Sequence, residues 1–206
     1  LVSHLRMEGK YNYYNQLVEP SKHDHVIFYF TDGTMLVYND TRKFGTMELV
    51  ELNHEQDLKS IVKLGVEPGS KELTEDYLIN CAKGKKTTIK QFLLDQTFIT
   101  GLGNIYVDEV LFEAKIHPLS HINHLEYDDY TRIIKYTNEI IAKSIKAGGT
   151  TVKSFTISGD VSGKFQHNLH VYGQKGEPCV YCQTPIEKIK VAGRGTHYCP
   201  KCQEIK

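Results

Sequence analysis

The sequence predicts an α+β chain of three successive parts, which are an antiparallel sheet, a helical segment and a small metal-binding hairpin. Three observations predict this order. Apolar and polar residues alternate with the two-residue period of strands over residues 1–52, and the period becomes helical from Asp57 onward. Four of the five cysteines then fall in the last 28 residues, in two C-x-x-C pairs.

One hairpin is clear within the strand region. Residues 25–30 and 35–38 are rich in β-branched and aromatic side chains, and the segment from Thr31 to Thr34 separates them. Asp32 and Gly33 in that segment favour the positive-φ positions of a tight turn. We therefore expect two antiparallel strands joined at this turn.

Four short helices are expected next. They cover residues 57–64, a segment that begins after Thr74, residues 88–94 and residues 104–115. Thr74 suits an N-cap because its side chain can accept a hydrogen bond from a free backbone amide. Glu75 and Asp76 then lie at the positive end of the helix dipole.

The longest helix is predicted at about Tyr127 to Ala147, before Gly148 and Gly149. Its mostly apolar stripe consists of Tyr130, Ile133, Ile134, Thr137, Ile140, Ile141 and Ser144. A Gly/Ser/Thr-rich loop is expected over residues 150–168.

The cysteine pairs predict a closed zinc site. Its ligands are Cys179, Cys182, Cys199 and Cys202, with sixteen residues between the pairs. Each C-x-x-C bend brings two sulfurs to one ion, and four thiolates satisfy tetrahedral zinc. A redox pair or disulfides are the alternative, but neither pair sits at a strand-to-helix junction of thioredoxin type. Strands at 185–191 and 196–198 would form the hairpin, and a reducing, cytoplasmic compartment is expected. Cys81 stands alone in a helical pattern.

Composition favours a globular protein without a membrane span, because the 206 residues are 40% hydrophobic and 24% charged and the apolar runs are short. The formal net charge of zero argues mildly against a nucleic-acid partner. Its distribution is uneven, with 8 basic and 13 acidic residues in 1–80 and 17 basic and 12 acidic residues in 81–206. The basic half suits either a phosphate-binding surface or a solvated basic face.

Two glycine motifs do not predict a nucleotide site. The segment from Gly84 to Thr87 resembles the end of a P-loop, but Ile79 stands where the first glycine belongs. The segment from Gly101 to Asn104 lacks the third glycine of a dinucleotide fingerprint. It does predict a turn that opens a helix at Asn104, where free amides can hold a phosphate or simply form a helix corner.

Several segments, in order along the whole chain, resemble formamidopyrimidine-DNA glycosylase. They are residues 3–9, 40–45, 64–68, 101–106, 148–151, and 171–173 through the four-cysteine hairpin. The resemblance implies base-excision repair of double-stranded DNA: a glycosylase and lyase that removes oxidised purines (formamidopyrimidine, 8-oxoguanine) and cuts the abasic strand by β,δ-elimination. It also implies three segments: part of an N-terminal β-sandwich in 1–55, a helix-two-turn-helix domain in 56–168 and a zinc finger in 169–206. The enzyme would be bacterial, monomeric and associated with the nucleoid.

The resemblance assigns Met7, Arg42 and Phe44 to filling the gap that a flipped-out base leaves in the duplex. Met and Phe can replace base stacking, and Arg42 can hydrogen-bond the orphaned partner base. From the residues alone, core strand positions are the favoured interpretation of Met7 and Phe44, although both stand beside turn residues.

The resemblance also implies contacts that hold the DNA backbone. These come from His4, His23, Arg42, Lys86, Asn104, Tyr172, Lys188 and Arg194. Arg194 would support the final elimination at the sugar phosphate, and it is expected at the hairpin tip between Gly193 and Gly195. An arginine in a turn can also be simply solvated.

Lesion recognition would fall to Val152, Lys153, Ser154 and Phe155. Their backbone amides and hydroxyl can contact the exposed edge of a flipped oxidised guanine. The length of this loop, and the pairing of Arg42 with Phe44, favour the formamidopyrimidine branch over the related endonuclease VIII branch, which acts on oxidised pyrimidines. A mobile loop without DNA is compatible with either branch.

The family's nucleophile is an N-terminal proline, assisted by a glutamate and a lysine, and the 206 residues contain no matching segment. The chain opens at Leu1 as if inside a strand, so we expect a partial sequence of a full enzyme, or a truncated DNA-binding remnant. The polypeptide as given should bind DNA without forming a Schiff base.

Two other classes of protein remain as alternatives. A structural zinc-ribbon and helical module explains the C-terminal 150 residues but not the strands that carry Met7, Arg42 and Phe44. A metal-dependent hydrolase needs an open site, whereas four cysteines close theirs.

Overall fold

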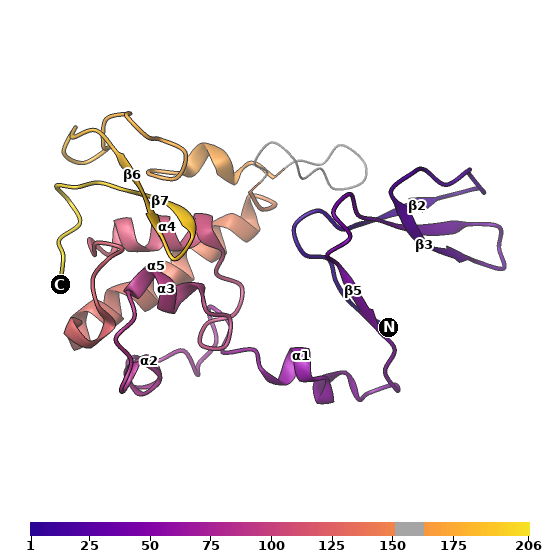
Figure 1. Ribbon diagram of the computed structural model, residues 1–206, viewed down its shortest axis with the longest axis horizontal. Helices are drawn as coiled ribbons and strands as arrows, with labels where there is room; N and C mark the ends of the chain where they lie inside the picture. The colour runs from indigo at the N-terminus through magenta and orange to yellow at the C-terminus, as the bar shows by residue number, and fades with distance from the viewer. Residues whose placement is uncertain (151–162) are drawn as a thin grey trace. The chain divides into compact units, whose positions relative to one another are not determined.

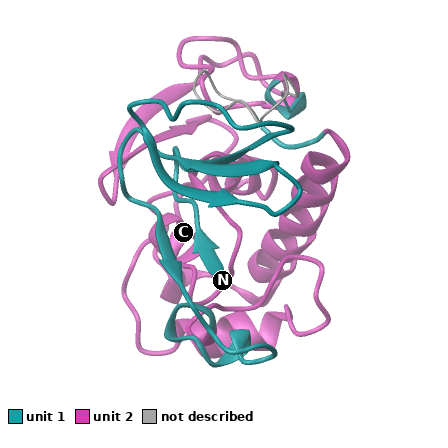
Figure 2. Ribbon diagram, turned by 90° about the vertical axis from the view of Figure 1, so that its right-hand side faces the viewer, with its two compact units in different colours: residues 1–61, 148–166 teal, residues 62–147, 167–206 magenta. Residues whose placement is uncertain are grey.

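The computed structural model describes residues 1–150 and 163–206, and the chain divides into two compact units (Figures 1 and 2). Unit 1 comprises residues 1–61 and 148–166, and unit 2 comprises residues 62–147 and 167–206. Antiparallel strands fill the first part of unit 1, while unit 2 combines helices with the cysteine-rich hairpin. The α+β class predicted from the sequence is therefore confirmed.

Unit 1 holds two small antiparallel sheets. Strands β1 (Val2–His4) and β5 (Thr46–Glu48) form one. The other has the order β2-β4-β3, with β2 at Lys10–Tyr14, β3 at Asp24–Tyr29 and β4 at Met35–Asn39. The central strand is the best buried, because Met35, Val37 and Tyr38 are all shielded from solvent.

The turn between β3 and β4 lies where it was predicted but has a different form. Of its two central residues only Gly33 has a positive φ, of 84°. The Asp32 carboxylate accepts hydrogen bonds from the backbone amide and the hydroxyl of Thr34, at 2.9 and 2.7 Å. The amide of Phe30 closes the loop on the carbonyl of Thr34. Asp32 therefore stabilises the turn through its side chain and not through its backbone conformation.

The helix predicted at 57–64 was too long. The structure has a 3-10 turn at Glu55–Asp57 and a single helical turn, α1, at Lys59–Val62. The chain then leaves the helical path because Gly65 donates its amide to the Gln96 carbonyl, at 2.8 Å. A Cβ at Gly65 would lie 2.3 Å from the backbone of Phe98, so this close approach requires glycine.

Unit 2 contains the other predicted helices. They are α2 (Glu75–Ala82), α3 (Ile89–Leu94), α4 (Asn104–Glu113) and α5 (Tyr127–Lys146). Thr74 caps α2 as expected, because its hydroxyl accepts the Tyr77 amide at 3.2 Å. The predicted stripe of α5 faces inward, with Tyr130, Ile133 and Ile140 buried.

Helix α4 is the centre of unit 2. All residues from Val107 to Phe112 are buried, and the helix packs against α3, α5 and the last strand (Figure 1). That strand, β7 (Arg194–Tyr198), pairs antiparallel with β6 (Glu187–Val191). No helix within residues 1–150 and 163–206 is long and apolar enough to cross a membrane.

Candidate nucleic-acid interface and zinc centre

The four cysteines of the hairpin converge on one point in unit 2. All four sulfurs lie within 4.8 Å of one another. The Sγ atoms of Cys179 and Cys202 are 3.9 Å apart, and those of Cys182 and Cys199 are 3.5 Å apart. Tetrahedral zinc with Zn–S bonds of about 2.3 Å requires S–S distances of roughly 3.8 Å. The geometry therefore fits a closed zinc site.

The polypeptide around the sulfurs keeps them in place but has opposite effects on their pKa values. Burial raises the pKa of the Cys199 and Cys202 thiols. Hydrogen bonds from Thr184 lower the pKa of the Cys182 thiol to about 6. Gln203 joins the second knuckle to the segment that follows α4, because its side chain accepts the Cys199 amide at 2.8 Å and donates to the Ile116 carbonyl at 2.9 Å. Phe112 of α4 packs in the same buried cluster as Cys179 and Cys199.

Arg194 lies in the last strand and not in the turn, where the sequence predicted it. The β-turn residues are Ala192 and Gly193, with φ of 49° and 77°, and Arg194 is the first residue of β7, opposite Val191. A positive φ is uncommon for a residue such as Ala192, so the sequence alone did not identify the two residues of the turn. The Arg194 side chain is exposed beside this turn.

Two side chains of α4 hold the backbone of β7. The amide of Asn104 donates to the Gly195 carbonyl at 3.0 Å, and the Asp108 carboxylate accepts the His197 amide at 2.8 Å. Asp108 also forms an ion pair with Lys90 of α3, and both side chains are fully buried. Burial lowers the pKa of Lys90, while the Asp108 charge opposes this shift. Arg194 therefore lies directly before a stretch of β7 that α4 holds at Gly195 and His197.

A third side chain of α4 holds the segment that carries Tyr172. Glu109 accepts the backbone amides of His170, Val171 and Tyr172 at 2.8, 3.0 and 2.8 Å. Burial raises the pKa of Glu109, although these hydrogen bonds oppose the shift. The Tyr172 ring meets the His197 ring edge-on, with centroids 4.9 Å apart.

The predicted DNA-binding residues of unit 2 therefore fall into one connected group and one separate position. Asn104, Tyr172, Lys188 and Arg194 all lie on β6 and β7 or on segments that contact them, with Lys188 directly opposite His197. Lys86 lies on the exposed link between α2 and α3, where its carbonyl accepts a hydrogen bond from His121.

Met7, Arg42 and Phe44 come together on unit 1, and we call them the tip cluster. The Arg42 Nη1 atom is 3.8 Å from the Met7 sulfur, and its guanidinium carbon is 4.6 Å from the Phe44 ring centre. Met7 is 65% exposed and Phe44 is 56% exposed. The interpretation of these two residues as core is therefore wrong, because both project from loops between strands.

The two histidines predicted for unit 1 have local backbone partners. The Nδ1 atom of His4 accepts the amide of Arg6 at 3.1 Å, and the His23 carbonyl accepts the amide of Asp40. His4 is exposed and His23 is half-buried. The predicted lesion-recognition residues Val152, Lys153, Ser154 and Phe155 lie outside the described residues.

Sequence reasoning missed the acidic residues that hold these elements in place. Asp40, Asp108 and Glu109 are 1%, 1% and 3% exposed, and each accepts at least one backbone amide. The available signal was two adjacent acidic residues inside the apolar helix 104–113, where a charge needs a partner.

Comparison with known proteins decides the family. Three family models match in succession: the N-terminal domain of formamidopyrimidine-DNA glycosylase at residues 1–47, its H2TH domain at 64–156, and the zinc finger found in FPG and IleRS at 176–205. A formamidopyrimidine-DNA glycosylase from Lactobacillus helveticus is 53% identical over 205 residues, covering all of this chain and 74% of that protein. One from Exiguobacterium sibiricum is 51% identical with the same coverage.

The chain belongs to the formamidopyrimidine-DNA glycosylase family. Solved structures agree: Lactococcus lactis Fpg with abasic-site DNA gives a TM-score of 0.89 at 43% identity, over 98% of this chain and 74% of that one. MutM with DNA that contains carbocyclic 8-oxo-G gives 0.88 at 42% identity, over 98% and 73%. By family the chain is a DNA glycosylase and lyase of base-excision repair, with DNA as its partner, and its four cysteines hold one structural zinc ion.

Proposed function

We propose that the chain recognises oxidised purines in double-stranded DNA, and that the tip cluster and the zinc hairpin make separate contributions. The observation that carries this proposal is the pairing of two features. One is an exposed apolar cluster with a single arginine on unit 1, and the other is a rigidly held basic hairpin on unit 2. Relatives solved with Fapy-dG and 8-oxo-G DNA support the oxidised purine as the lesion.

The tip cluster would fill the duplex after a base is extruded. Extrusion breaks stacking and pairing, which costs a few kcal/mol, and apolar side chains inserted in the gap offset part of that cost. Met7 and Phe44 supply apolar surface, and the guanidinium of Arg42 between them supplies donors for the unpaired base. His4 and His23, which belong to the same unit, would contact phosphates of the DNA.

Unit 2 would hold the backbone of the damaged strand. Lys86, Asn104, Tyr172 and Lys188 would contact phosphates, and Arg194 would act at the sugar phosphate during the elimination step. Attachment of β7 to α4 through Asn104 and Asp108 supports this role, because a phosphate contact needs a donor with a fixed position. Val152, Lys153, Ser154 and Phe155 would contact the extruded base.

The proposed segments are part of the β-sandwich domain in 1–55, the helix-two-turn-helix domain with the lesion loop in 56–168, and the zinc finger in 169–206. We propose a monomer that acts in the bacterial cytoplasm on the nucleoid. The bacterial sources of the relatives support the setting.

Equilibrium binding tests the proposal. Affinity should be measured for matched duplexes that contain 8-oxoguanine, an abasic-site analogue, or no damage. We expect tighter binding to both damaged duplexes, and loss of most of that preference in Phe44→Ala. Lys71→Ala, a surface lysine of unit 2 outside the proposed sites, is the matched control and should bind like the parent chain. Equal affinity for all three duplexes would contradict the proposal.

A further inference from the structure

We propose that Asp40 and Tyr38 are positioning residues that hold the two loops of the tip cluster in one arrangement before DNA binds. This inference rests on the proposed function, because it concerns how the tip cluster is prepared for insertion. Neither residue belongs to the tip cluster, and both are buried beneath it.

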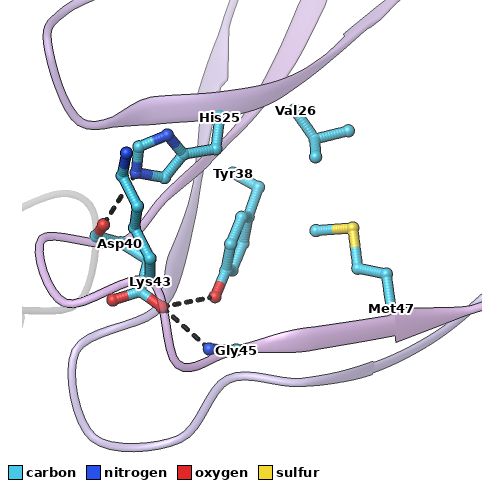
Figure 3. Close-up of a pocket in the computed structure, with 7 residues that line it drawn as sticks. All are labelled: His25, Val26, Tyr38, Asp40, Lys43, Gly45 and Met47. Carbon is cyan, nitrogen blue, oxygen red and sulfur yellow. Dashed lines mark hydrogen bonds between the residues drawn. The ribbon is translucent and has the colours of Figure 1, made fainter.

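Asp40 gathers the backbone of the loop that carries Arg42 and Phe44. Its Oδ1 atom accepts the Arg42 amide at 3.0 Å, and its Oδ2 atom accepts the amides of Phe44 and Gly45, both at 2.9 Å. The same Oδ2 atom accepts the Tyr38 hydroxyl at 3.0 Å, as Figure 3 shows. Both DNA-facing residues of this loop therefore have their own amides bound to one carboxylate.

The charge on Asp40 persists at every physiological pH. The hydrogen bond from Gly45 and those from Arg42, Tyr38 and Phe44 lower the pKa of Asp40 to about 2, against the opposing effect of burial. An ionised carboxylate acts only as an acceptor, at both of its oxygens. Asp40 therefore remains an acceptor for all four hydrogen bonds throughout the physiological pH range.

Tyr38 connects this loop to the one that carries Met7. A Cβ on Gly45 would lie 1.7 Å from the Tyr38 hydroxyl oxygen, and a Cβ on Gly9 would lie 2.5 Å from the same atom. Gly9 closes the Met7 loop by donating its amide to the Leu5 carbonyl at 3.0 Å. Both loops thus pack against the same Tyr38 hydroxyl group, which leaves no space for a side chain at Gly9 or at Gly45.

The tip cluster needs such support because its own contacts are weak. Its members touch one another through an exposed cation–π contact and a long contact between Arg42 and sulfur. Exposed side chains on free loops would lose conformational entropy on insertion into DNA. Loops already ordered by Asp40 and Tyr38 lose less, so the gain should be seen in lesion binding and base extrusion and not in phosphate contact.

The test uses two conservative variants and one matched control. Asp40→Asn removes the charge and one acceptor, and Tyr38→Phe removes only the hydroxyl. Asp32→Asn is the control, because Asp32 also holds a turn of unit 1 through its carboxylate but lies at the β3–β4 turn, away from the tip cluster. Each variant is measured for affinity to abasic-site and undamaged duplexes, and for fluorescence of 2-aminopurine placed opposite the lesion.

We expect Asp40→Asn and Tyr38→Phe to weaken abasic-site binding about tenfold and to reduce the fluorescence change. Asp40→Asn removes the charge that strengthens four hydrogen bonds, and Tyr38→Phe removes one of the four. In both variants, binding of the undamaged duplex and its salt dependence should remain as in the parent chain. Asp32→Asn should match the parent chain in every measurement. Adding Asp40→Asn to Phe44→Ala should change affinity by less than about twofold, because the two residues act through one element.

The outcomes separate the two proposals. If Phe44→Ala leaves lesion binding intact, the proposed role of the tip cluster is wrong. If Phe44→Ala weakens it while Asp40→Asn and Tyr38→Phe do not, the tip cluster stands and the positioning role is refuted. Equal losses on damaged and undamaged duplexes, or full additivity in the double variant, would also refute it, because they indicate a general effect on folding.

Discussion

Two buried carboxylates, one in each unit, accept nearly the same hydrogen bonds but have pKa shifts of opposite direction. Asp40 of unit 1 and Glu109 of unit 2 each accept three backbone amides from a segment that carries proposed DNA-binding residues. The pKa of Asp40 is lowered to about 2, whereas the pKa of Glu109 is raised.

The difference lies in what surrounds each group. Asp40 stands in a loop that lines an open cavity of about 380 Å³, so hydrogen bonding outweighs desolvation. Glu109 lies on α4 in the interior of unit 2, and there desolvation outweighs the same number of amides. The number of backbone amides alone therefore does not determine the direction of the pKa shift.

Zinc removal should produce the largest difference between the units. The zinc-ligand hairpin has little core of its own, and structural zinc contributes about 10–16 kcal/mol in small domains. Chelation should disorder the region of the four cysteines and abolish DNA binding, while the β2-β4-β3 sheet of unit 1 remains folded. Metal content, DNA affinity and amide exchange measure this effect.

Cys81→Ser is the matched control for chelation, because Cys81 lies on α2 apart from the ligand set. It should retain one zinc ion and normal binding. Tight DNA binding by a metal-free sample would contradict the structural role of zinc.

Breaking the buried ion pair of unit 2 should have the next largest effect. Asp108→Ala leaves the Lys90 ammonium buried without its partner, and such losses reduce the free energy of unfolding by about 3–5 kcal/mol. Glu139→Gln is the control, because its contact with Lys143 at 3.9 Å is on an exposed face and contributes less than about 1 kcal/mol. Chemical denaturation measures both. Equal effects in the two variants would show that Asp108 is not a structural centre.

The two carboxylates should shift stability in different pH windows. Glu109 has a raised folded pKa, so its contribution is fully present below about pH 4.5 and is lost as the pH rises through the folded value. Asp40 has a lowered pKa, so its contribution is present above about pH 4 and is lost as the pH falls towards 2. Chemical denaturation at several pH values measures this. Glu109→Gln should lose the pH dependence assigned to Glu109, and Asp40→Asn should lose the one assigned to Asp40. A shared window would contradict the distinction between burial and hydrogen bonding.

Salt dependence should show the smallest effect. Arg194→Ala or Lys188→Ala should reduce the slope of log affinity against log salt by about 1, because one phosphate contact is lost. Met7→Ala should leave that slope unchanged, because Met7 carries no charge. Fluorescence anisotropy at several salt concentrations measures the slopes. An altered slope in Met7→Ala would show that the tip cluster and the phosphate contacts do not act separately.

The sequence predicted the features that depend on local spacing. The two C-x-x-C pairs specify the zinc ligands, the stripe of α5 follows its helical period, and Thr74 caps α2 through its own side chain. Each of these depends on residues that are close in sequence or on strong metal–ligand chemistry. The family resemblance supplied the candidate DNA-binding residues, which periodicity could not have identified.

The features that were missed or misplaced depend on distant partners. Glu109 binds amides more than sixty residues away, and Asp108 binds the His197 amide across 89 positions. The helix expected at 57–64 is shortened because Gly65 pairs with Gln96. Positive φ at Ala192 and Gly193 closes the turn within two residues, so Arg194 is the first residue of β7 and not part of a four-residue turn.

One measurement tests most directly whether the two units divide the work of DNA recognition. It is the ratio of affinities for abasic-site and undamaged duplex, compared between Phe44→Ala and Arg194→Ala at fixed salt. We predict that Phe44→Ala brings this ratio close to one by weakening only the damaged complex, while Arg194→Ala weakens both complexes by similar factors and keeps the ratio. A preserved ratio in Phe44→Ala, or a collapsed one in Arg194→Ala alone, would contradict this division.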